Sequence, residues 1–199
     1  MEYKNENVAG ILIFFTLIQW YFVEYILSYL EPGYNFSTEY ISELGAPGAT
    51  NAAIFNASIV LVGIGLISGS YFLYRASASE TIFPNRLFAI LMMLFGICFI
   101  GVGLAPLHAY PDYVPLPFHI IFGNIAQAVR IIAIFVSVKI TKPPLSYALL
   151  ILGVISFVTQ ILFLTQLDLG LGAGGNQRLD VLVWTTFLIV ISTHLMSKS

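Results

Sequence analysis

The chain has 199 residues, of which 58% are hydrophobic and only 9% are charged, and its formal net charge is −2. A water-soluble domain carries roughly 25% charged residues, so this composition excludes an ordinary soluble protein, and the slightly acidic balance argues against a nucleic-acid partner. The single cysteine, Cys98, excludes an internal disulfide. The chain is therefore expected to lie in a lipid bilayer.

Six apolar segments follow one another along the chain, each long enough to cross about 30 Å of hydrocarbon. In chain order they cover residues 8–30, 52–74, 87–106, 118–139, 146–166 and 179–196. Stretches rich in Gly, Pro and Asn separate them. Because a chain in lipid must satisfy its own backbone hydrogen bonds, each segment is predicted to be a helix. The sequence thus predicts a single all-α domain over residues 1–199, an integral membrane bundle of six transmembrane helices.

The basic residues are distributed unequally between the two sides of such a bundle. Most of them fall at the termini and in the second and fourth connections, which share one side: Lys4, Arg75, Arg86, Lys139, Lys142 and Lys198. Arg178 falls in a connection of the opposite side, and Arg130 lies inside a segment. Because cytoplasmic loops are enriched in Lys and Arg, both termini are predicted to be cytoplasmic, with the protein in the cell membrane.

The connections on the predicted outer side are longer and chemically more varied, and we expect them to carry the function. In the first of them, NFSTEYISELGAP predicts a short helix at the membrane surface, with Ser37 as its cap and Gly45 at its end. Asn56, about one turn into the second segment, must find a polar partner inside the membrane. In the same segment Gly65 and Gly69 form a GxxxG pattern, which indicates a helix contact.

The fourth segment holds an arginine, Arg130, near its centre. At about 100° per residue, the small and polar residues of this segment share one stripe with it. That stripe comprises His119, Gly123, Ala126, Gln127, Ala133 and Ser137. The other side is Ile, Phe and Val, so Arg130 is predicted to face other helices or a wet cavity. An arginine at a helix centre costs about 2.5–3.5 kcal/mol on insertion, so a compensating interaction is expected.

Three interpretations of Arg130 stay open at this point. In the first, the side chain of Arg130 extends toward the cytoplasm and bonds backbone carbonyls. In the second, it forms a structural lock with Gln19, Gln127 or Glu24. In the third, it belongs to a ligand or transport site. Glu24 is the only acidic residue well inside a segment, about 9 Å below the outer edge, against about 18 Å for Arg130. Asp180 is expected to lie higher still, in the first turn of the sixth helix, where its charge suits the helix dipole.

Other chemistry-bearing residues form no familiar catalytic pattern. His108 and His119 flank the connection between the third and fourth segments, but their spacing does not suit a metal, and no metal site or cofactor is predicted. His119 is expected to be a hydrogen-bonded cap at the start of the fourth helix. Arg178 and Asp180 are expected to cap the sixth helix and anchor it at the membrane interface, and Arg178 is also suited to hold a phosphate or carboxylate headgroup. The sequence contains no P-loop, GxGxxG or HExxH motif.

Three motifs of the predicted outer side, taken in order, resemble a known family. They are YISELGAP with a following Asn51-x-x-x-Phe55, then GVGLAP with His119 downstream, and then NQR before the last segment. The pattern resembles the prokaryotic membrane family catalogued as domain of unknown function 998, over nearly the whole chain. Members typically show an Ile-Ser-Asp/Glu-Leu-Gly motif, a Gly-x-Phe-Pro motif with a later His, and Glu-Arg near the last helix.

The chain departs from this pattern at two positions, because Ala105 replaces the usual Phe and Gln177 the usual Glu. The second replacement puts any role of position 177 as an acid in doubt. The family has no settled activity, so the resemblance implies the membrane architecture and little beyond it. By motif, it draws attention to Ser42, Glu43, His119 and Arg178.

The leading hypothesis is a non-enzymatic membrane protein. It has an outward-facing polar pocket among the first, second, fourth and sixth helices, which binds a lipid headgroup or a small polar ligand. Glu43, His119, Arg178 and Asp180 are expected at its mouth and Arg130 at its floor. The candidate residues are Glu24, Ser42, Glu43, Asn56, His119, Gln127, Arg130, Arg178 and Asp180.

Other function classes remain open beside this hypothesis. One is an accessory subunit of a larger membrane complex, whose partners are membrane lipids and other membrane-protein subunits. Another is a membrane-embedded lipid hydrolase or transferase, which needs a bound metal or a nucleophile within hydrogen-bond reach of His119. A six-helix channel or carrier also stays open.

Overall fold

The computed structural model describes residues 4–77, 83–107, 118–167 and 169–197. Within these residues all regular secondary structure is helical. The long helices are α1 Asn5–Leu30, α2 Ala52–Ala76, α3 Phe83–Leu104, α4 Phe118–Ile140, α5 Leu145–Thr165 and α6 Gly172–Met196, and a short 3-10 helix, η1 Ile41–Gly45, lies between α1 and α2. All six long helices have the length and apolar composition to cross a membrane. The predicted all-α, six-helix membrane fold is confirmed.

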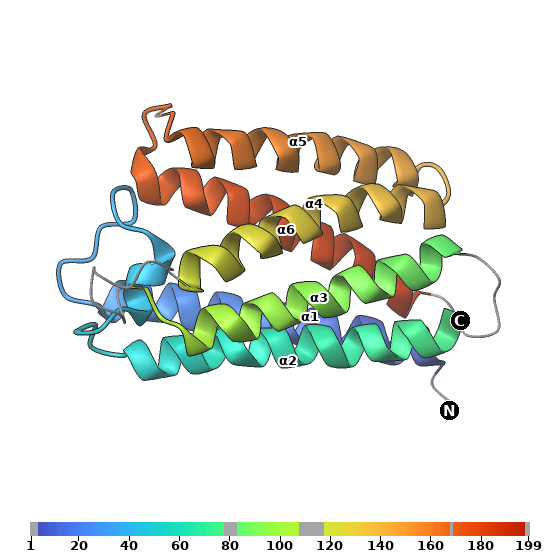
Figure 1. Cartoon of the computed structure of the whole chain (residues 1–199), viewed down its shortest axis with the longest axis horizontal. Coiled ribbons are helices and arrows are strands. Elements are labelled where there is room, and N and C mark those ends of the chain that lie inside the picture. Colours follow the sequence, from blue (N-terminus) through green and yellow to red (C-terminus); the bar gives the residue numbers. More distant parts are fainter. Residues whose placement is uncertain (1–3, 78–82, 108–117, 168, 198–199) are drawn as a thin grey trace.

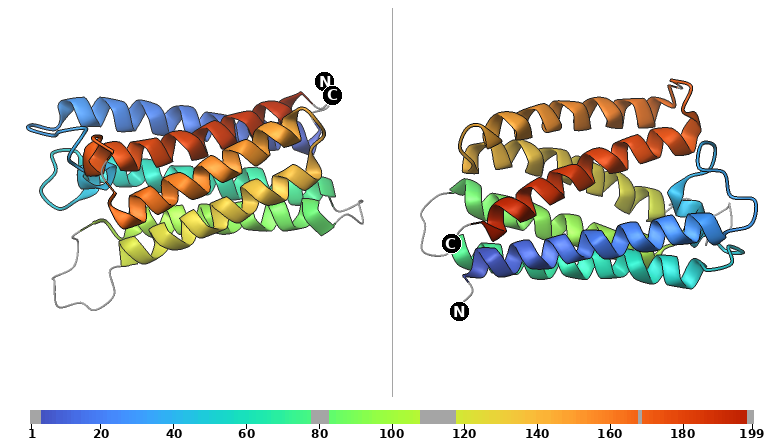
Figure 2. Two further views of the ribbon diagram at one scale, coloured as in Figure 1. Left: turned by 90° about the horizontal axis from the view of Figure 1, so that it is seen from above. Right: turned by 180° about the vertical axis from the view of Figure 1, so that it is seen from behind.

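The helices form a closed bundle in which each packs against its neighbours in chain order and α6 packs back against α1 (Figure 1). The start of α1 and the end of α6 lie at the same end of the bundle, which we call the terminus end. η1 lies at the opposite end, which we call the loop end. α4 and α5 lie close together at the terminus end and spread apart toward the loop end (Figures 1 and 2).

The surface and the interior of α5 differ in chemistry. Its outward side exposes large apolar residues such as Tyr147, Ile151 and Leu164, which is the surface that a helix presents to lipid. Its buried side is small and polar and carries Ser146, Gly153, Ser156, Thr159 and Gln160. The interior between α4, α5 and α6 is therefore polar although the helices are apolar in composition.

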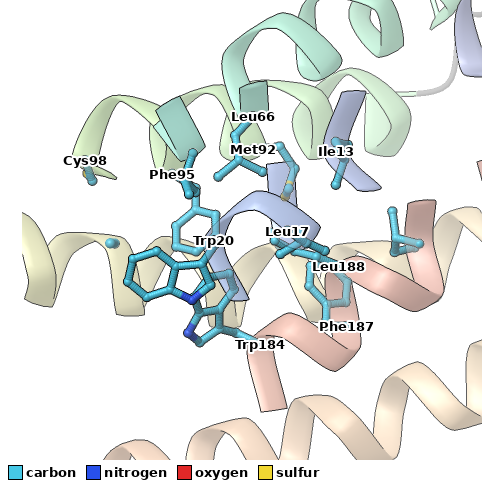
Figure 3. Packing of buried hydrophobic residues seen from close by; sticks show 14 of the residues in the cluster. Ile13, Leu17, Trp20, Leu66, Met92, Phe95, Cys98, Trp184, Phe187 and Leu188 are labelled. Atoms are coloured by element: carbon cyan, nitrogen blue, oxygen red, sulfur yellow. The ribbon is translucent and has the colours of Figure 1, made fainter. Parts of the chain in front are cut away.

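The apolar core is formed mainly by α1, α2, α3 and α6, with smaller contributions from α4 and α5, and is built around aromatic rings (Figure 3). The rings of Trp20 and Phe55 lie 5.6 Å apart between centroids, and the ring of Trp184 lies 5.9 Å from Phe95 and 5.4 Å from Phe99. The edge-to-face contacts of Trp184 add to the stabilisation that burial gives. The core thus fixes α6 against α3 as well as against its chain neighbours.

Glycines allow the closest helix contacts. A Cβ atom on Gly63 of α2 would lie 2.5 Å from the carbonyl oxygen of Gly96 on α3, so a side chain at either position would force the two helices apart. Gly65 and Gly69 of α2 instead face Thr16 and Ile13 of α1. The helix contact that the GxxxG pattern predicts is confirmed, with α1 as the partner.

The start of α6 differs from the prediction, because the helix begins at Gly172 and not near residue 179. The sequence of the Gly-rich stretch predicts a loop, but in the structure its glycines allow a close contact with the α1–α2 loop. A Cβ atom on Gly174 would clash with the carbonyl oxygens of Phe36 and Glu39, and the backbone N–H of Gly175 donates to the carbonyl of Ser37 at 3.0 Å. The first turns of α6 therefore pack under the α1–α2 loop.

The short helix expected in that loop is also different. Only Ile41–Gly45 is helical, as η1, and Ser37 does not cap it. The hydroxyl of Ser37 donates instead to the carbonyl of Leu171 at 2.6 Å, because the loop is folded onto the start of α6. Gly45 ends the helix as predicted.

Candidate functional site at the loop end

Arg130 and Asp180 form an ion pair inside the bundle. Arg130 is 0% exposed, and its Nη1 and Nη2 donate to Oδ2 and Oδ1 of Asp180, each at 2.9 Å. The carboxylate also accepts from Nε2 of Gln127 and from the hydroxyl of Thr159, both at 3.0 Å. Charge-assisted bonds in this two-point geometry are among the strongest in proteins. The pair therefore joins α4, α5 and α6 at their buried faces.

This arrangement excludes one of the three interpretations of Arg130. The inward orientation is confirmed, and extension toward the cytoplasm is wrong, because the guanidinium bonds a carboxylate in the interior. The expectation that Asp180 lies too high, in the first turn of the helix, is also wrong. Because α6 begins at Gly172, Asp180 lies about 12 Å along it and within reach of a long arginine side chain. Of the expected partners, Gln127 shares in the lock by bonding Asp180.

Several buried polar atoms of this region have no hydrogen-bond partner among the described residues. They are Nε of Arg130, Oγ of Ser156 and Oε1 of Gln160. Buried polar groups are nearly always hydrogen-bonded in native proteins. The interior between α4 and α5 therefore has donor and acceptor capacity that the described residues leave unused.

Two adjacent cavities, which share part of their lining, lie on the loop-end side of the ion pair. The outer chamber, of about 400 Å³, lies between η1, α4, α5 and the start of α6. The inner chamber, of about 120 Å³, lies further into the bundle and is lined by the aromatic rings of α1, α2, α3 and α6. The residues that line both chambers are Ser42, His119, Gly123, Gln127 and Gln177. A Cβ atom on Gly123 would meet nothing within 4 Å, because this position faces the open space.

The η1 segment covers the chambers and is held there by hydrogen bonds. The backbone N–H of Ile41 donates to Oε1 of Gln177 at 2.5 Å, and the hydroxyl of Tyr40 donates to Oε1 of Gln166 at 3.1 Å. Nδ2 of Asn56 donates to the carbonyl of Gly45 at 2.9 Å. Asn56 thus has the polar partner expected for its position inside the membrane. It holds η1 in place and does not line either chamber.

His119 connects two helices at the chamber wall. Its Nδ1 lies 2.9 Å from the carbonyl oxygen of Ala105, just beyond the end of α3. The hydrogen bond expected for a histidine at the start of α4 is present. Across the described ranges, no three His, Cys, Asp or Glu side chains are grouped closely enough to hold a metal ion. His108 lies outside the described residues.

Arg178 belongs to a second polar cluster. Its Nη1 donates to the carbonyl of Phe36 at 2.7 Å, and its Nη2 donates to the hydroxyl of Tyr34 at 2.6 Å and lies 3.4 Å from Oε1 of Glu24. The guanidinium also lies over the ring of Phe36, 4.7 Å from its centroid. Burial raises the pKa of Tyr34, so the phenol keeps the proton. This cluster fastens the α1–α2 loop to α6.

The expected placement of Arg178 and Glu24 in the same pocket as His119 is therefore wrong. Both line a separate groove between α1 and α6, together with Tyr21, Tyr25 and Leu182. The reason is helical geometry, because consecutive residues point about 100° apart. Gln177 faces the chambers, and Arg178 faces the groove on the other side of α6.

The candidate residues thus fall into three groups. One group lines the chambers. A second group, Arg130 and Asp180, lies on the terminus-end side of the chambers. The third group holds the α1–α2 loop in place. The chamber residues are Ser42, Glu43, His119 and Gln127, and those that secure the loop are Glu24, Asn56 and Arg178. Gln127 joins the first two groups, because it lines both chambers and donates to Asp180.

Sequence reasoning missed three amide side chains of the wall: Asn124, Gln166 and Gln177. Asn124 lies about 140° around α4 from His119, which places it outside the inward stripe. An asparagine on the otherwise lipid-facing side of a membrane helix is the signal that identifies it. Gln166 lies in the turn after α5. Gln177 lies in a predicted loop if α6 begins at residue 179, whereas in the structure it lies in the helix.

The family model described as Protein of unknown function (DUF998) matches residues 10–194, and the chain belongs to this family. The resemblance carried by the three motifs is thereby confirmed. No curated protein and no solved structure matches the chain. The geometry of the loop end therefore has to carry the functional argument.

Proposed function

We propose that this is a non-enzymatic membrane protein whose two chambers bind a lipid headgroup or a small polar ligand. The observation that carries the proposal is the pair of adjacent cavities, about 400 and 120 Å³, with polar residues along their shared wall. Ligand sites are typically concave and mostly apolar, with a few polar groups that fix orientation. The aromatic inner chamber and the amides of the outer chamber fit that description.

The network under the chambers supports the same proposal. The side-chain amide of Gln127 donates a hydrogen bond to Asp180. Asp180 in turn accepts hydrogen bonds from Arg130 and Thr159. A side chain fixed in this way presents its remaining oxygen at a defined position, and preorganised groups bind ligands at a lower entropic cost. The ion pair thus acts on a ligand through Gln127 and not through direct contact.

The distribution of charge supports an outward-facing loop end. Among the described residues, the terminus end carries Lys4, Arg75, Arg86, Lys139 and Lys142, whereas the loop end carries Arg178. Basic residues accumulate on the cytoplasmic side of membrane proteins. We place the protein in the cell membrane with both termini cytoplasmic, so that the chambers are reached from outside or from the outer leaflet.

The test is native mass spectrometry of gently solubilised protein, comparing wild type with Gly123→Phe. The new ring enters the open space that Gly123 faces and fills the chamber. Ala128→Phe is the matched control, because Ala128 lies on the exposed side of α4 outside the chambers. A bound mass that is lost only in Gly123→Phe supports the pocket. A bound mass that survives in Gly123→Phe, or its absence from wild type, contradicts it.

The lipid hydrolase or transferase alternative rests on one observation, that Ser42 and His119 line the same chambers. It predicts turnover of a lipid ester that Ser42→Ala abolishes. The accessory-subunit alternative predicts a partner subunit that co-purifies with the chain at fixed stoichiometry. Either result moves the assignment away from a simple binding protein.

A further inference from the structure

Asn124 is a polar side chain in an unusual place. It is exposed on α4, about 9 Å from the start of a helix that is apolar enough to cross a membrane. Its side-chain amide has no hydrogen-bond partner among the described residues. An amide that faces hydrocarbon without a partner is costly. The same residue lines the outer chamber, so an occupant of that chamber is positioned to supply the missing partner.

The outer chamber reaches the side of the bundle. Ile120 and Asn124 on α4 and Leu164 on α5 line it, and all three are exposed, with Ile120 at 47% and Leu164 at 59%. The two helices spread apart toward this end (Figures 1 and 2). These residues lie within about 9 Å of the helix ends, in the part of the hydrocarbon next to the lipid headgroups. The opening therefore faces lipid rather than bulk water.

The chemistry of the wall limits the kind of headgroup. Its polar side chains include Ser42, Asn124, Gln127, Gln166 and Gln177, whose hydroxyl and amide groups provide both donors and acceptors. Among the described residues, no lysine or arginine lines either chamber. Phosphates and carboxylates offer only acceptors and are typically held by arginine or lysine.

The arginines nearby do not fill that role. Arg130 is bound by Asp180, and Arg178 is bound by loop carbonyls and Glu24 on the other side of α6. Glu43 adds an acidic side chain to the wall. An anionic headgroup thus meets no available guanidinium, whereas a hydroxyl group can donate to and accept from the amides. This argues against the phosphate or carboxylate ligand that the sequence suggested for Arg178.

We propose that the occupant is a membrane lipid with an uncharged, hydroxyl-bearing headgroup, which enters sideways between the loop-end halves of α4 and α5. The headgroup hydroxyls bond the amide of Asn124 and the neighbouring amides of the wall, and the acyl chains stay in the bilayer against Ile120 and Leu164. This inference rests on the proposed pocket and names the class of its ligand.

The experiment places the protein in phosphatidylcholine nanodiscs doped with equal amounts of monoglucosyl diacylglycerol and phosphatidylglycerol of matched acyl chains. Lipids retained after release from the disc are counted by native mass spectrometry. We expect the glucosyl lipid to be retained about tenfold over phosphatidylglycerol, the ratio that about 1.4 kcal/mol produces. Asn124→Leu is expected to remove this preference. Ala128→Leu places the same side chain on the exposed side of α4 and is expected to keep it.

The outcomes separate this inference from the proposed function. Preferential retention of phosphatidylglycerol, or an unchanged preference in Asn124→Leu, overturns the uncharged-lipid assignment. Binding of water-soluble methyl glucoside as tightly as the glucosyl lipid overturns the lipid assignment, because the headgroup alone then suffices. In either case Gly123→Phe still reports on the pocket, since loss of every bound mass in that variant keeps the pocket and changes only its ligand.

Discussion

Arg130 and Asp180 form a two-point ion pair, with Nη1–Oδ2 and Nη2–Oδ1 distances of 2.9 Å. Neither side chain is more than 1% exposed. They come from helices that are not consecutive in the chain. The pair thus fixes the depth of α6 relative to α4. That depth determines which side chains of α6 reach the chambers.

Removal of one member of this pair is expected to lower the free energy of unfolding much more than removal of both. Arg130→Leu or Asp180→Leu alone leaves a buried charge without its counter-ion, at a cost of about 3–5 kcal/mol. The double variant Arg130→Leu/Asp180→Leu leaves no charge and should be more stable than either single variant. The measurement is the free energy of unfolding in mixed micelles.

Thr159→Val provides the scale for that experiment, because it removes the hydroxyl that bonds Asp180 and the carbonyl of Ser156 and keeps the ion pair. Its expected cost is about 1 kcal/mol. If the double variant is as unstable as the sum of the two single variants, the ion pair does not act as a unit.

Arg178 is expected to control the α1–α2 loop without controlling the fold. Arg178→Ala removes the donors to Phe36 and Tyr34, so amide hydrogen exchange should become faster over residues 34–45 and change little in the long helices. Arg178→Lys should not restore protection, because an ammonium group cannot reproduce the planar fork. Uniformly faster exchange in all helices would instead make Arg178 part of the global core.

Two glycines are expected to respond in opposite ways to the same substitution. Gly123→Ala adds a methyl group in open space and removes a helix-weakening residue, so stability should stay equal or rise by up to about 1 kcal/mol. Gly63→Ala places a methyl group against the backbone of Gly96 and should destabilise the α2–α3 contact. Thermal unfolding of the two variants in one detergent checks both signs. Destabilisation by Gly123→Ala would mean that this position does not face open space.

The orientation is tested with single cysteines in a Cys98→Ser background. Thr38→Cys lies in the loop at the loop end and should react with a membrane-impermeant maleimide on intact cells. Lys142→Cys lies between α4 and α5 at the terminus end and should react only after the membrane is opened. The reverse pattern would place the chambers on the cytoplasmic side, against the distribution of basic residues.

The sequence by itself determined the six helices and the inward direction of Arg130, because both follow from local information. Hydropathy over about 20 residues marks a span, and the positions of His119, Ala126 and Ser137 around one helix mark its inner side. These features are properties of a single helix, and they hold whatever the helix packs against.

Only the tertiary structure decided what Arg130 bonds and which side chains share a site. The start of α6 at Gly172 depends on contact between its glycines and the α1–α2 loop, and this start brings Asp180 down to Arg130. The same contact directs Gln177 to the chambers and Arg178 away from them. Relative depth and rotation of two helices are set by packing between distant parts of the chain, which no local pattern encodes.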